Sequence, residues 1–157
     1  MKEHIDRWLV ASTSKFIWDR RSTLKLYIEG QDRSGNEEDY VQMRISGPYT
    51  NQYSRKDYLM RVELNFLISS IINETDNHKI FRMCGLVEKA LEPAIPVYRY
   101  GKDTGGVDTG AYIGCLQRIK AGDQEVITNH WGQVSPDVRV LQSTIEAHYQ
   151  LDVRLEN

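Results

Sequence analysis

Four polar residues on two predicted strands are the strongest candidates for chemistry in this sequence. Glu146, His148 and Asp152 lie on the outward side of an alternating stretch near the end of the chain, and Glu63 lies on the outward side of an earlier one. If the two strands pair, these side chains form one polar set. A carboxylate pair with a histidine is suited to acid and base catalysis, whereas opposite charges across two strands form an ordinary charge ladder. The ladder is the simpler interpretation.

A glycine-rich stretch from Gly101 to Gly110, GKDTGGVDTG, invites comparison with ligand-binding loops. A phosphate-binding loop requires Gly-Lys-Ser or Gly-Lys-Thr followed by a helix, but here Asp103 replaces the hydroxyl residue and no helix is expected next. Asp103 and Asp108 are suited to a hard cation such as calcium, yet a calcium loop needs more oxygen ligands at alternate positions. We therefore expect a mobile, solvated loop that becomes ordered against a neighbour in an assembly.

No other residue pattern predicts a reaction. The histidines are scattered, without a second histidine or a cysteine at metal-binding spacing. A Gly-x-Ser-x-Gly elbow is absent, and Cys84 and Cys115 form no Cys-x-x-Cys pair. The sequence thus predicts a protein that is not an enzyme, with no cofactor and no metal, and with both cysteines reduced in a cytoplasmic product.

Length and composition limit the classes of protein. A chain of 157 residues is expected to form a single α+β domain over 1–157 and to bury a core without disulfides or metals. With 27% charged residues and a net charge of -2, it predicts neither disorder nor a general affinity for nucleic acid. We expect no sequence-specific nucleic-acid binding. The first residues do not resemble a signal peptide, and no stretch is apolar enough for a membrane span.

Periodicity places these residues on a sheet with two helices. The stretch from Arg55 to Leu91 reads as one long strand, a polar turn and an amphipathic helix ended by Pro93. The predicted fold is α+β, an antiparallel β-sheet with an N-terminal helix and one central helix packed on it. The other predicted elements are a helix over 2–21, a hairpin over 24–46 ended by Gly47-Pro48, an edge strand over 95–100, two weaker strands over 111–118 and 124–131, and a strong strand over 144–155 beside the long one.

Several residues are predicted to contact another subunit rather than to react. They are an exposed tryptophan on the first helix, tyrosines of a polar loop over 49–58, the outward residues of the long strand, and the glycine-rich loop. The candidates are Trp18, Tyr49, Tyr53, Arg61, Glu63, Asn65, Gly101, Asp103 and Asp108.

The order of elements resembles a family of small virion proteins. A leading helix, the arm YVQMRISGPY, the long strand RKDYLMRVELNFLIS, a single helix and the closing strand TIEAHYQLDVRLE are similar to neck and tail proteins of tailed phages, particularly the tail terminator or tail-completion group. The resemblance rests on architecture, because this family has no signature motif. The length of the loop over 101–110 and the two weak strands after it depart from the family pattern.

The resemblance implies a structural protein of the virion, assembled in the host cytoplasm. It implies subunits arranged as a ring, expected to be a hexamer, between the tail tube and the head-connector proteins, with a lumen that passes DNA. It carries over no catalytic residues. The alternatives are another virion component, such as a head-completion or baseplate subunit, a small enzyme whose site forms only in the fold, or a monomeric module that binds a peptide or sugar.

Overall fold

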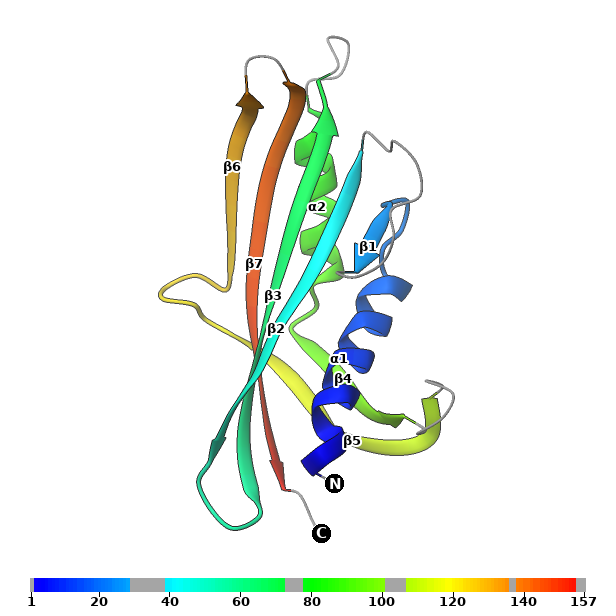
Figure 1. Cartoon of the computed structure of the whole chain (residues 1–157), viewed down its shortest axis with the longest axis vertical. Coiled ribbons are helices and arrows are strands. Elements are labelled where there is room, and N and C mark those ends of the chain that lie inside the picture. Colours follow the sequence, from blue (N-terminus) through cyan, green and yellow to red (C-terminus); the bar gives the residue numbers. More distant parts are fainter. Residues whose placement is uncertain (1, 29–38, 73–77, 101–106, 136–137, 155–157) are drawn as a thin grey trace.

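The computed structural model of the chain describes residues 2–28, 39–72, 78–100, 107–135 and 138–154. These residues form two helices and seven strands (Figure 1). In chain order the elements are α1 (Lys2–Asp19), β1 (Leu26–Ile28), β2 (Tyr40–Gln52), β3 (Asp57–Ile71), α2 (Lys79–Ala90), β4 (Ala94–Tyr100), β5 (Val107–Ile119), β6 (Val126–Ser135) and β7 (Val138–Arg154).

The strands form one curled, mixed sheet, so the α+β class is confirmed but the purely antiparallel sheet is not. The strand order is β1-β2-β3-β7-β5-β4. β6 also pairs with β7, on the same edge as β5: β6 lies beside Val138 to Ala147, and β5 lies beside His148 to Gln150. The predicted hairpin between the first two strands is wrong, because β1 runs parallel to β2, with Leu26 opposite Val41. Turn-forming residues after Ile28 favoured a hairpin, but such composition does not fix the direction in which the next strand returns.

The two longest strands, β3 and β7, are paired along their lengths, as predicted. Their antiparallel register runs from Asp57 opposite Arg154 to Ile71 opposite Val140. Alternate side chains of both strands are buried, as the period of two requires. Because a slip of one residue would turn the apolar side chains of either strand toward solvent, this register is strongly specified.

A bulge in β2 corrects the expectation that Gly47-Pro48 ends the strand. The register of β2 with β3 shifts between Ser46 and Tyr49, and the strand then continues to Gln52. The polar loop predicted over 49–58 therefore shrinks to a turn between Gln52 and Asp57. The bulge also changes the phase of the alternation. Ser46 and Tyr49 are three residues apart, yet they lie opposite Glu63 and Arg61 and therefore face the same side of the sheet.

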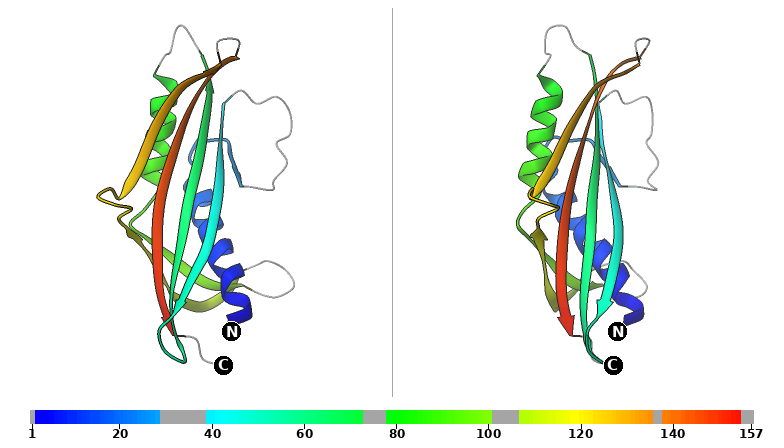
Figure 2. Two further views of the ribbon diagram at one scale, coloured as in Figure 1. Left: turned by 60° about the vertical axis from the view of Figure 1, so that its left-hand side comes forward. Right: turned by 90° about the vertical axis from the view of Figure 1, so that its left-hand side faces the viewer.

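Both helices lie on the same side of the sheet (Figure 2). α1 contacts β4 and β2, whereas α2 contacts β3 and β7. The predicted helix stripe is confirmed, because Ile5, Leu9 and Phe16 are buried. At the α1 contact the backbone N–H of Tyr98 donates to Ser12 Oγ over 2.9 Å. The helices and the sheet thus enclose one apolar core.

A buried tyrosine in that core has a hydrogen-bond partner at an element junction. Tyr149 in β7 is 0% exposed, and its hydroxyl donates to the carbonyl of Glu92 after α2 over 2.7 Å. Burial raises the pKa of Tyr149 to about 12. Cys84 on α2 is also buried and unpaired with Cys115, and burial raises its pKa. Among the described helices, none combines the length and apolar character needed to cross a bilayer.

The remaining predictions concern the glycine-rich stretch and the start of α2. β5 begins at Val107, so the last part of the predicted loop over 101–110 is strand. The first part, over 101–106, and the predicted capping residues of α2, over 73–77, lie outside the described residues. The edge strand is confirmed, because β4 ends the strand order.

Candidate functional site

The candidate site is the face of β2, β3, β7 and β6 that points away from both helices, which we call the outer face (Figures 1 and 2). The core lies on the opposite side of these strands, and no described element packs on the outer face. Most of its side chains are polar, charged or aromatic, with the aliphatic Leu59 and Leu67 among them. They include Gln42, Arg44, Tyr49, Arg61, Glu63, Asn65, Asn129, Trp131, Thr144, Glu146, His148 and Gln150.

Three side chains converge at the centre of the outer face. Glu63 lies directly opposite His148 in the register of β3 and β7, and its Oε1 is 3.6 Å from His148 Nδ1. Glu146 Oε1 is 2.8 Å from the other ring nitrogen, Nε2. One potential ligand atom from each residue lies within 4.8 Å of the other two. The predicted polar set therefore forms for these three residues, which we call the central triad.

The fourth predicted member, Asp152, does not join the central triad. Its carboxylate accepts a short hydrogen bond from the hydroxyl of Tyr53, which lies in the turn between β2 and β3. This hydrogen bond raises the pKa of Tyr53 to about 12. The contact ties the exposed turn to the last part of β7, so Tyr53 borders the outer face.

The outer face carries two shallow depressions, on either side of the central triad. The larger, of about 500 Å³, lies between β2 and β6, where Arg44, Trp131 and Glu146 line it. The smaller, of about 320 Å³, is lined by residues including Tyr49, Arg61 and Glu63. Both are open to solvent. A broad, shallow, mixed-charge surface of this kind suits contact with a macromolecule better than enclosure of a small substrate.

Most of the predicted contact residues gather on or beside the outer face. Tyr49, Arg61, Glu63 and Asn65 lie on it, and Tyr53 borders it. Trp18 is exposed as predicted, but it lies on α1 on the other side of the sheet, where the guanidinium of Arg21 stacks over its ring. Gly101 and Asp103 lie outside the described residues, and Asp108 falls in β5.

Sequence reasoning missed the most exposed aromatic residue of the outer face. Trp131 is 65% exposed, and its ring N–H donates to Thr144 Oγ1 over 2.9 Å. Its side chain lies on the outer face by alternation along β6, since Asn129 lies opposite Thr144 on that face and His130 lies opposite Ser143 on the helix side. Alternation along the predicted strand over 124–131 was the available signal, because it places Trp131 on the same side as Asn129.

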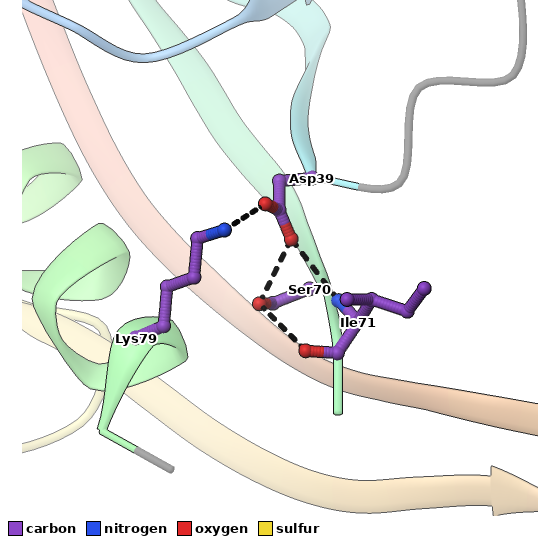
Figure 3. Close-up of polar contacts among 4 residues, drawn as sticks. All are labelled: Asp39, Ser70, Ile71 and Lys79. Carbon is purple, nitrogen blue, oxygen red and sulfur yellow. Dashed lines mark hydrogen bonds and ion pairs between the residues drawn. The ribbon is translucent and has the colours of Figure 1, made fainter. Parts of the chain in front are cut away.

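On the helix side, a polar clamp joins the start of β2, the end of β3 and the start of α2 (Figure 3). Asp39 accepts hydrogen bonds of 3.0 Å from Ser70 Oγ and from the backbone N–H of Ile71, and it pairs with Lys79 at close range. Burial raises the pKa of Asp39, but these hydrogen bonds outweigh it, so the pKa is lowered overall. The clamp has a structural role at the junction of these three elements, since each of its polar groups has a hydrogen-bonding or charged partner within it.

A serine and a histidine also meet on the helix side. His130 Nδ1 is 2.8 Å from Ser143 Oγ, and the ring of Phe81 packs edge-on against His130 with centroids 4.7 Å apart. Ser143 is only 1% exposed, so no substrate reaches its hydroxyl. The pair satisfies a buried hydroxyl and does not form an accessible nucleophile.

Comparison with known proteins adds information on the fold alone. No family model matches the sequence, and no curated protein matches it. The fold is similar to that of a solved protein structure that carries no functional name. That similarity has a TM-score of 0.51 at 10% identity and covers 100% of this chain and 98% of the other.

Proposed function

We propose that this chain is a structural virion protein of a tailed phage that forms a ring at the head-tail junction, as tail terminator or tail-completion proteins do. The observation that carries the proposal is the uncovered outer face. Four long strands present charged and aromatic side chains there, while both helices lie on the other side. A surface that is rich in Tyr, Trp and Arg is typical of protein interfaces.

A ring requires a heterologous contact, in which one surface of each subunit meets a different surface of the next. The outer face is well suited to one side of such a contact. Arg61, Glu63 and Glu146 place charges of both signs near its centre, and Tyr49 and Trp131 are exposed on either side of them. Mixed charges fix the register of a contact, and the aromatic rings supply buried area.

The proposal extends to partners and location. The ring is expected to be a hexamer that contacts the tail tube and the head-connector proteins in the virion and leaves a lumen for DNA. The order of elements supports this assignment in part, since the leading helix, the long strand, the single helix and the closing strand occur in the family order. The hairpin that the resemblance also implied does not form, because β1 runs parallel to β2. We further propose that the protein is not an enzyme. Both depressions of the outer face are open and shallow, and the Ser143 hydroxyl is buried.

The test is the mass of the particles that the purified full chain forms. Light scattering coupled to size-exclusion chromatography, with electron microscopy of the same fractions, is expected to show closed rings. Arg61→Glu and Trp131→Ala are expected to shift the population toward monomers. Lys89→Glu is the matched control, because it reverses an exposed charge on α2, away from the outer face. It is expected to leave the rings intact.

Two results would contradict the proposal. One is a wild-type monomer at every concentration reached, by itself and when mixed with isolated phage tails. The other is a set of rings that both Arg61→Glu and Trp131→Ala leave intact, because the outer face would then take no part in the contact between subunits. Circular dichroism of each variant separates lost assembly from lost folding.

A further inference from the structure

We propose that the central triad of Glu63, Glu146 and His148 binds one divalent transition-metal ion of the zinc type. The three side chains come from two adjacent strands, and one ligand atom from each lies within 4.8 Å of the other two. Zinc bonds to histidine nitrogen and carboxylate oxygen measure roughly 2.0–2.2 Å. Because the two carboxylates lie against different ring nitrogens, binding one ion requires at least one glutamate side chain to rotate toward the nitrogen that ligates the ion.

The backbone that carries the triad is rigid and its register is fixed. Glu63 and His148 are directly opposed in the middle of the β3–β7 ladder, and Glu146 follows two residues before His148 on the same side of β7. The alternate residues Val62, Leu64 and Ala147 are buried beneath them. A slip that would separate the ligands would therefore also expose the core. Such a site is largely formed before any ion arrives, which lowers the entropy cost of binding.

Charge also favours a cation at this position. Two carboxylates face one imidazole, at 2.8 Å from Nε2 and 3.6 Å from Nδ1. A neutral imidazole has one N–H and one nitrogen lone pair, so it satisfies one carboxylate and presents its lone pair to the other. An imidazolium, with both nitrogens protonated, donates to both carboxylates, but its single positive charge leaves one of the two negative charges unbalanced. A divalent ion balances both carboxylates and uses the nitrogen lone pair.

The ligand set identifies the class of ion. Magnesium and calcium prefer sites made of oxygen atoms alone, whereas an imidazole nitrogen with carboxylates suits zinc and neighbouring first-row ions. His148 is 12% exposed at its side chain, against 27% for Glu63 and 39% for Glu146. The imidazole thus lies at the floor of the site, and the solvent side remains open for water or for a group from another molecule.

The test is titration of the untagged full chain with zinc by calorimetry, and with cobalt by visible absorption, which reports the ligand geometry. One saturable site is expected. Glu63→Gln, Glu146→Gln and His148→Gln preserve side-chain size closely enough for folding, and each is expected to weaken zinc binding by at least about tenfold, the lower bound typical of losing a supporting group.

Two matched controls identify the site. Asp152→Asn removes a carboxylate from the same side of β7, outside the triad, and His130→Gln removes a histidine from the neighbouring strand. Both are expected to retain the wild-type affinity. Absence of a saturable site, or binding that survives all three triad variants or is lost in His130→Gln, would overturn the proposal. It does not depend on ring formation, because the titration is made on whichever species, monomer or ring, the chain forms.

Discussion

Replacing Gly47 by alanine tests whether the bulge in β2 fixes the outer face. Gly47 has a φ of 105°, and a Cβ built there would lie 2.8 Å from the carbonyl oxygen of Arg61 and 3.0 Å from the backbone nitrogen of Tyr49. Both atoms belong to the backbone, so neither can move away without distorting the β2–β3 pairing. The left-handed conformation alone costs an L-residue about 1–3 kcal/mol, and the two contacts add to that cost.

The free energy of unfolding is therefore expected to fall by about 2–4 kcal/mol. For a domain of this size, a loss of that order lowers the melting temperature by roughly 4–16 °C. Urea unfolding followed by circular dichroism gives the free energy, and calorimetry gives the melting temperature. Because the bulge directs Tyr49 to the outer face, Gly47→Ala is also expected to impair ring formation under conditions where the variant is still folded.

Two other glycines separate the causes of the loss. Gly132 has a φ of 70° with nothing within 4 Å of its Cβ position, so Gly132→Ala measures backbone strain without the contacts. Gly85 lies in α2 with the same free space, and Gly85→Ala is expected to stabilise the fold by roughly 0.5–1 kcal/mol. If Gly47→Ala proves no less stable than Gly132→Ala, the close backbone contacts at the bulge do not contribute and the reasoning is refuted.

Two further predictions concern groups with shifted pKa values. Tyr149→Phe leaves the carbonyl of Glu92 without its donor and is expected to cost about 1–2 kcal/mol at neutral pH. Since the pKa of Tyr149 is raised to about 12, the unfolded chain releases this proton first as pH rises, and the wild type is expected to lose roughly 2–3 kcal/mol between about pH 10 and 12. Urea unfolding at several pH values should show that Tyr149→Phe lacks this alkaline loss of stability. An identical pH dependence of the unfolding free energy in both proteins would contradict this role of Tyr149. Asp39→Asn is expected to cost about 1–3 kcal/mol at neutral pH. Because the pKa of Asp39 is lowered below 3.8, its contribution is present above that value and is lost as pH falls through the folded pKa, so the two proteins should converge in acid. A constant difference down to the acid limit would show that the charge of Asp39 is not what matters.

The alternation of side chains made the central part of this structure predictable. The stretch around Glu63 and the stretch around His148 each alternate strictly, so their pairing and the meeting of these two residues follow from burying one face of each strand. The same rule predicted that Arg61 and Asn65 face outward. These inferences succeeded because they require only the local alternation of apolar and polar residues and one long-range pairing of strands.

The features that escaped prediction depend on contacts that a local pattern does not encode. Gly47-Pro48 has the composition of a strand end, and only the partner strand β3 shows that the ladder continues beyond it. The parallel direction of β1 is likewise set by its neighbour. In each case a non-local pairing overrides the meaning of the local residues.

The length of β7 has a mechanical consequence. This strand pairs with β3 from Val140 to Arg154 on one edge, while β6 and then β5 share its other edge. The hydrogen bonds of an antiparallel ladder run perpendicular to the strands. A pull along β7 therefore loads all of these hydrogen bonds in shear at once, whereas a pull across the sheet would open them one after another. The outer face is thus mounted on the part of the fold that best resists stretching along its strands.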